Sequence, residues 1–113
     1  MADLSQCPGV QTAVLSTEEG LAMDVAESTP VGNQLAAVAG FMLATTQLSL
    51  SMLGLQESQE LVVQGTGGSF LVSRPFQVGQ SRLILSAIFD PAVPYKRLFN
   101  QTIQAIQQTV EKS

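Results

Sequence analysis

Side chains that commonly carry out catalysis are scarce in this chain of 113 residues. It contains no histidine, which excludes imidazole bases, Ser-His and Cys-His nucleophile systems and histidine metal sites. Its only cysteine, Cys7, can form neither an internal disulfide nor a thiolate zinc site, and it favours a reducing, cytoplasmic compartment. Because Cys7 precedes Pro8 close to the N-terminus, we expect an inert thiol rather than a reactive one.

Two short segments could be mistaken for chemical sites. Asp24 and Glu27 lie three residues apart in a stretch of strand character, so they point to opposite faces and cannot share a proton. The segment Gly65-Thr66-Gly67-Gly68 is glycine-rich like a phosphate loop, but a strand-like run, 69–73, follows it instead of a helix. We therefore expect a hairpin turn there, and we predict no catalytic residue, no metal and no cofactor.

The charge balance excludes further classes of function. The formal net charge is −4, and only 12% of the residues are charged while 45% are apolar. The five cations, Arg74, Arg82, Lys96, Arg97 and Lys112, cannot form the basic face that nucleic acid or an anionic membrane surface requires. So few charges also favour a protein whose surface is partly covered by a partner.

The element that organises the chain is an uncharged segment from Val31 to Leu55, predicted to be a helix that begins near Asn33 and ends at Gly54. Its bulky residues share one arc, which predicts a core face: Leu35, Val38, Phe41, Met42, Thr45, Leu48 and Met52. Its other side carries small or uncharged residues that suit close approach by a second helix: Ala37, Gly40, Ala44, Gln47 and Ser51, beside Leu43 and Leu50. We therefore expect this helix to be covered on both sides, once by another subunit.

A membrane span is the alternative interpretation of the same segment, because 35–55 is long enough to cross a bilayer. Its second half is crowded with Thr, Ser and Gln, and no Lys or Arg flanks it before Arg74. We therefore expect no direct insertion into a membrane.

The remaining segments predict one domain over residues 1–113. Residues 3–7 can form a short helix, 12–16, 21–27, 61–64, 69–76 and 82–89 are strand-like, and 95–112 is an amphipathic helix. The run 82–89 is apolar on both faces, which places it centrally with helices above and below. We expect an α+β sandwich: a five-stranded antiparallel sheet with the long central helix on one face and the N- and C-terminal helices on the other.

With this order of elements the chain resembles the roadblock / dynein light chain family, whose members are profilin-like sandwiches. The resemblance extends from about residue 4 to residue 112 and lies in layout and spacing; the first helix departs from it in being very short. The matching segments are Pro8-Gly9-Val10, Glu19-Gly20-Leu21-Ala22, Met52-Leu53-Gly54-Leu55, Leu61-Val62-Val63 and Phe89-Asp90-Pro91.

The resemblance implies a dimer, with itself or with a paralogous subunit. In that family the long helices pair across a two-fold axis and the third strands join into one sheet. The implied interface therefore contains Ala37, Gly40, Ala44, Gln47 and Ser51 on the helix and Leu61, Val62 and Val63 on the strand.

Similar proteins are not enzymes but platforms for small Ras-like GTPases, or light chains of motor complexes. The leading expectation is therefore a dimeric, non-enzymatic scaffold that binds and regulates a small GTPase. Arg74, Arg82 and Arg97 are expected to be surface charges rather than catalytic arginines supplied to a GTPase. A structural adaptor is one alternative. A ligand sensor with a pocket between sheet and helix is another, although Met23, Met42 and Met52 are better explained as core methionines.

Overall fold

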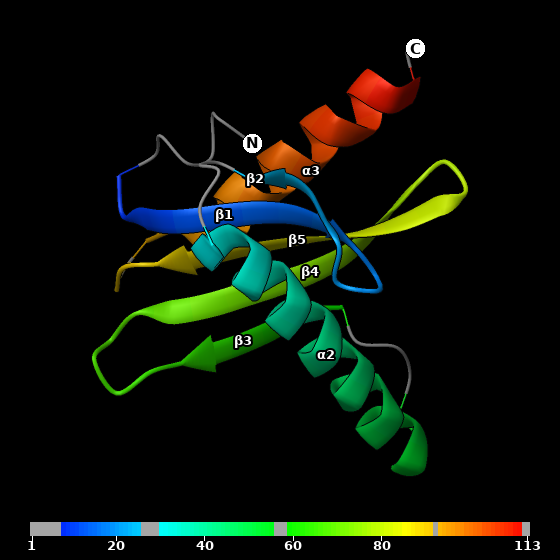
Figure 1. Cartoon of the computed structure of the whole chain (residues 1–113), viewed down its shortest axis with the longest axis horizontal. Helices are drawn as coiled ribbons and strands as arrows, with labels where there is room; N and C mark the ends of the chain where they lie inside the picture. The colour runs from blue at the N-terminus through cyan, green and yellow to red at the C-terminus, as the bar shows by residue number, and fades with distance from the viewer. Residues whose placement is uncertain (1–7, 26–29, 56–58, 92, 112–113) are drawn as a thin grey trace.

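The computed structural model describes residues 8–25, 30–55, 59–91 and 93–111, and Figure 1 shows their arrangement. The predicted short helix at 3–7 lies outside the described residues. In chain order the elements are β1 (Val10–Thr17), β2 (Ala22–Val25), α2 (Pro30–Met52), β3 (Leu61–Gln64), β4 (Phe70–Val78), β5 (Ser81–Phe89) and α3 (Tyr95–Glu111).

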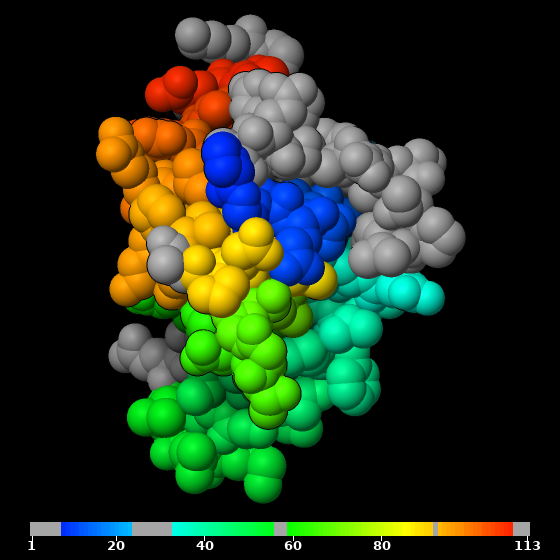
Figure 2. All heavy atoms as spheres, turned by 90° about the vertical axis from the view of Figure 1, so that its left-hand side faces the viewer, coloured from blue at the N-terminus to red at the C-terminus, as the bar shows by residue number. Residues whose placement is uncertain are grey.

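The five strands form one antiparallel sheet in the order β2-β1-β5-β4-β3, which confirms the predicted fold class. β5 is the central strand, as its two apolar faces predicted. Leu85 and Phe89 pack with Phe99 of α3, whereas Ile84 packs with Leu43 of α2. The sheet therefore lies between α2 on one face and α3 on the other, as Figure 2 shows from the side.

Aromatic side chains anchor α3 to its face of the sheet. Phe89 and Phe99 are completely buried, and their ring centroids lie 5.6 Å apart. Phe70 and Tyr95 extend this cluster, with centroids 5.4 Å apart in an edge-to-face arrangement. Offset and edge-to-face contacts of this kind are favourable because of the ring quadrupoles. They stabilise the cluster in addition to the burial of the apolar ring surfaces. This cluster fixes where α3 begins relative to β4 and β5.

The end of α2 follows the predicted glycine signal. Gly54 has a φ of +74°, the left-handed conformation that ends many helices. The N–H of Leu55 donates to the carbonyl of Leu50 at 2.8 Å, and that of Gly54 donates to Ser51 at 3.2 Å. This pair of bonds is a Schellman motif. At the other end Pro30 opens the helix, a position where a missing N–H costs nothing.

The outer edge of β4 is only partly covered, because β3 pairs with 70–73 and leaves 74–78 unpaired on that side. A proline within a strand predicts either an end or an edge, and Pro75 lies at this open edge, because β4 continues through it to Val78. In the two-residue hairpin Val78 faces Ser81, so alternation directs the backbone of Pro75 and Gln77 away from β5. Pro75 has no N–H, and the Gln77 carbonyl accepts a bond from the Gln107 side chain at 2.9 Å.

Candidate functional site

The most unusual surface of the molecule is the solvent-facing side of α2. Val38, Phe41, Leu48 and Met52 are 48%, 73%, 64% and 81% exposed, and we call these four residues the outer face of α2. Their spacing on one arc of the helix predicted that all four are core residues, and that prediction is wrong. Of the predicted core arc, Leu35 is buried, at 6% exposure. Large apolar side chains gathered on one exposed helix face are typical of an interaction site.

The opposite side of α2, with its smaller residues, faces the sheet. Gly40 packs on the β1–β2 turn so closely that a Cβ added to it would lie 3.0 Å from the Cα of Gly20. Ala36 and Ala39 are completely buried beside it. α2 carries no charged side chain on any side, so bulk alone could not show which side faces the sheet. The side with small residues packs on the sheet, because small side chains let the helix backbone approach the strands.

The five predicted interface residues of α2 occupy different environments. Gly40 is buried against its own chain, so its assignment to a subunit interface has to be corrected. Ala37, Ala44 and Ser51 are exposed and Gln47 is half-buried. Together with Gly40, the last three border a groove of about 340 Å³ between α2 and the sheet. For the four residues other than Gly40, the assignment to a subunit interface stays a prediction.

The three predicted interface residues of the sheet lie on β3, an edge strand. Leu61 is half-buried and packs against Ala39 and Leu43. Val62 and Val63 are 45% and 41% exposed. β3 therefore offers a free backbone edge with two exposed valines, which is the geometry that strand addition between subunits requires.

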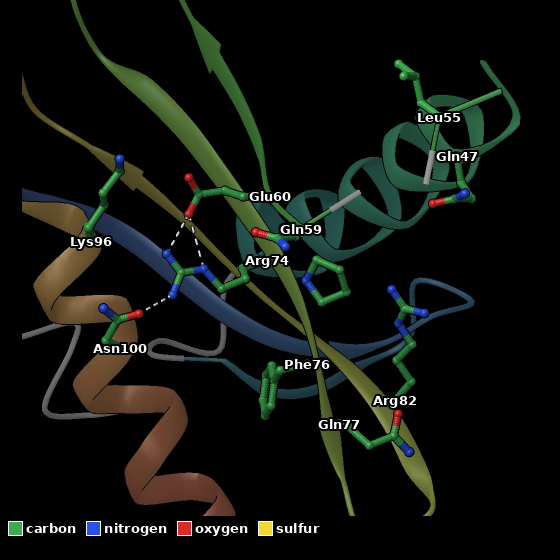
Figure 3. A pocket seen from close by; sticks show the side chains of 11 residues that line it. Gln47, Leu55, Gln59, Glu60, Arg74, Phe76, Gln77, Arg82, Lys96 and Asn100 are labelled. Atoms are coloured by element: carbon green, nitrogen blue, oxygen red, sulfur yellow. Dashed lines mark hydrogen bonds and ion pairs between the residues drawn. The ribbon is translucent and has the colours of Figure 1, made fainter. Parts of the chain in front are cut away.

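A polar cluster joins β4 to the start of α3, and sequence reasoning did not anticipate it (Figure 3). The Arg74 guanidinium donates from Nε and Nη2 to Oε1 of Glu60, at 3.1 and 2.6 Å, and from Nη1 to Asn100. It also lies 5.5 Å from the centroid of the Phe99 ring. The hairpin register was the missed signal: since Leu61 faces Ser73, the preceding and following residues, Glu60 and Arg74, are neighbours.

The hydroxyl of Tyr95 completes this cluster by donating to Oε2 of Glu60 at 3.3 Å. Burial raises the pKa of Tyr95 above its ordinary value near 10, and the Glu60 carboxylate raises it further by its charge and by accepting the phenol proton. Both oxygens of Glu60 are thus engaged. The arrangement can fix the start of β3 and α3, but it contains no activated nucleophile.

The three methionines of the ligand-sensor alternative do not come together. Met23 and Met52 are exposed and Met42 is half-buried, so these three methionines do not line a common pocket. Among the described residues, no group of three His, Cys, Asp or Glu side chains could hold a metal ion.

One helix of the described chain is long and apolar enough to cross a bilayer. It spans Asn33–Met52, with a mean hydropathy of 1.5 and 28% of the stretch buried. In this structure Leu35, Ala36, Ala39 and Leu43 of that helix pack on the sheet. They give the helix a place in the domain core.

Solved structures show what this arrangement is similar to. A Roadblock/LC7 domain from Streptomyces avermitilis superposes with a TM-score of 0.77 at 17% sequence identity, covering 99% of this chain and 92% of that one. The chain has the roadblock fold. No protein-family model and no curated protein matches it.

Two MglB structures share the roadblock fold with this chain. MglB of Myxococcus xanthus gives a TM-score of 0.76 at 19% identity, over 98% of this chain and 91% of that one. MglB with a tetrameric arrangement gives 0.74 at 22% identity, over 97% and 84%. Nearly whole-length coverage confirms the predicted resemblance at the level of the fold.

Proposed function

We propose that this roadblock-fold protein is a dimeric, non-enzymatic scaffold that binds and regulates a small Ras-like GTPase in the cytoplasm. The observation that carries the proposal is the outer face of α2, where Val38, Phe41, Leu48 and Met52 are exposed. The family resemblance suggests the GTPase as a partner, and the single cysteine suggests the cytoplasm as the compartment.

A second copy, or a paralogous subunit, is the partner that this face fits best. Val38, Phe41, Thr45, Leu48 and Met52 recur at alternating steps of three and four residues, the spacing with which two helices interdigitate. Pairing of two such helices about a two-fold axis is self-complementary. The tetrameric arrangement of one MglB neighbour supports self-association within this fold.

The proposed dimer retains most of the predicted interface residues, but the centre of the helix contact moves to the outer face of α2. Phe41 and Leu48 lie at the centre of the helix contact, with Ala37, Ala44 and Ser51 at its margins. Val62 and Val63 of β3 form the strand contact, since this strand has an unpaired edge.

In the proposed mechanism the dimer presents a rigid surface to the GTPase. Such a surface can shift a GTPase between nucleotide states only if its contacts differ in strength between those states. The switch segments are the elements that differ, because the γ-phosphate orders them. The regulatory function therefore predicts that the protein prefers one nucleotide state of its partner.

Light scattering on wild type and on Phe41→Glu tests the dimer. We expect a dimer for wild type and a folded monomer for Phe41→Glu, because an unpaired carboxylate is costly in an apolar interface. Gln104→Glu on α3 is the charge control: it adds the same negative charge at an exposed position on the opposite layer. Gly40→Glu is uninformative, because Gly40 contacts Gly20 within one chain. A monomeric wild-type protein would contradict the homodimer.

Binding and turnover assays with a co-purifying GTPase separate regulation from scaffolding. We expect the GDP-loaded and GTP-loaded forms to bind with different affinities, and turnover to change when the protein is added. Equal affinities with unchanged turnover would leave a structural adaptor or motor light chain, the alternative function.

A further inference from the structure

A second surface lies along the uncovered edge of β4, between the end of α2 and the start of α3 (Figure 3). It is an open recess of about 1160 Å³ with mainly polar walls. Arg74, Arg82 and Lys96 line it, and among the lining residues that the structure describes Glu60 is the one with an acidic side chain. We call this surface the basic recess.

The positive charge of the basic recess is unusual for this chain. All five Lys and Arg residues lie at position 74 or later, whereas seven of the nine Asp and Glu residues precede it. Three of those five cations line one recess, in a protein with a net charge of −4. A local field opposite in sign to the net charge attracts and orients an anionic partner.

The recess already holds one carboxylate, that of Glu60, which accepts two N–H bonds from Arg74 and the hydroxyl bond of Tyr95. Its side chain and that of Arg74 are 19% and 20% exposed, so the pair is fixed rather than mobile on the surface. Lys96 is exposed, and within the described residues no ion pair includes it. Its charge is therefore available to a further carboxylate beside this ordered pair.

We propose that the basic recess binds a short segment rich in Asp and Glu from a partner protein. The proposal goes beyond the scaffold function, since it concerns β4 and α3 and not the outer face of α2. Side chains rather than strand pairing hold the segment, because Pro75 has no N–H to offer and Gln107 already occupies the Gln77 carbonyl. Three cations on an acidic protein are too few for nucleic acid, which requires many phosphate contacts.

Fluorescence anisotropy with a labelled Asp/Glu-rich peptide tests the proposal, and a Gln/Ser peptide of equal length serves as the reference probe. We expect the acidic peptide to bind and the neutral peptide not to bind. Added salt should weaken the binding, because exposed charges are screened within about 10 Å at 0.1 M ionic strength. Circular dichroism on each variant shows whether it is folded.

Lys96 and Arg97 provide a matched pair of variants. Both are exposed cations at the start of α3, but only Lys96 lines the recess. We expect Lys96→Glu to weaken binding by about tenfold, which corresponds to roughly 1.4 kcal/mol. Arg97→Glu makes the same change in net charge and should alter binding by less than about twofold. Equal losses in the two variants would mean that net charge and not the recess attracts the peptide, and would overturn the proposal. Absent or salt-insensitive binding, or tighter binding of a single-stranded DNA probe, would also overturn it.

Discussion

Gly40 of α2 and Gly20 of the β1–β2 turn are in backbone contact, with 3.0 Å between the Cα of Gly20 and the point where a Cβ of residue 40 would lie. Replacing a helical glycine by alanine ordinarily stabilises a protein by about 1 kcal/mol. At Gly40 we expect the opposite sign, a loss of about 1–3 kcal/mol, because the added methyl group meets backbone that cannot move aside. Urea unfolding at a fixed protein concentration measures the change.

Gly67→Ala is the control for this prediction, because a Cβ there meets nothing within 4 Å. We expect it to change stability little or to raise it slightly by restricting the unfolded chain. A stabilised Gly40→Ala variant would contradict the contact between the helix and the turn.

The single tyrosine of the chain allows its ionisation to be measured directly. The pKa of Tyr95 is raised by burial and by Glu60, so phenolate absorbance should appear at higher pH in the folded protein than in urea. In Glu60→Gln we expect the pKa of Tyr95 to move back toward its ordinary value, and to remain above it because burial persists. Identical titrations of the folded and unfolded protein would refute this expectation.

The same shift gives a dependence of stability on pH. Above the ordinary pKa of tyrosine, near 10, the unfolded chain loses the phenol proton while the folded chain keeps it. The contribution of Tyr95 is therefore complete below that pH and declines as the pH rises toward the raised pKa. Comparing unfolding free energies of wild type and Tyr95→Phe across this range isolates the effect, since the phenylalanine variant lacks it.

The ion pair between Glu60 and Arg74 should make a small but measurable contribution. Both side chains are about one-fifth exposed, so we expect a coupling of roughly 1 kcal/mol in a double-mutant cycle with Glu60→Gln and Arg74→Gln. Arg74→Lys should recover only part of it, because a lysine ammonium cannot donate to Glu60 and Asn100 from one planar group. A coupling of zero would show that the pair is incidental.

The uncovered edge of β4 yields a prediction about solubility. Pro75→Val introduces an outward N–H in a strand whose outer edge is unpaired over 74–78. We expect this variant to aggregate faster on heating than wild type, because a free edge with donors and acceptors pairs with other chains. Gln107→Ala, which uncovers the Gln77 carbonyl, should act in the same direction. Turbidity during a thermal ramp distinguishes these variants, and unchanged onset temperatures would refute the protective role.

Most of the fold followed from local signals in the sequence. The central position of β5 was visible in its two apolar faces, and the end of α2 in Gly54. The β3–β4 turn was recognised because a strand, not a helix, follows Gly68. These features depend on residues close together in the chain, where periodicity and turn chemistry are informative.

The candidate site was harder to predict because it depends on which side of α2 meets the sheet. A helix without charges has no charged side that marks the solvent, and the bulk of its side chains predicts the wrong side as the core. The contact between Gly40 and Gly20 shows that the side with small residues faces the sheet. It joins residues from different elements, so local periodicity does not reveal it. Phe41 and Leu48 lie outside because this contact and the packing of Leu43 on Ile84 turn the other side of α2 to the sheet.

The outer face of α2 also affects how long an unassembled subunit survives in a cell. A subunit without its partner presents Phe41, Leu48 and Met52 to chaperones and proteases, which select such surfaces. Unassembled copies are therefore expected to be short-lived, so the supply of the partner sets how much of this protein accumulates.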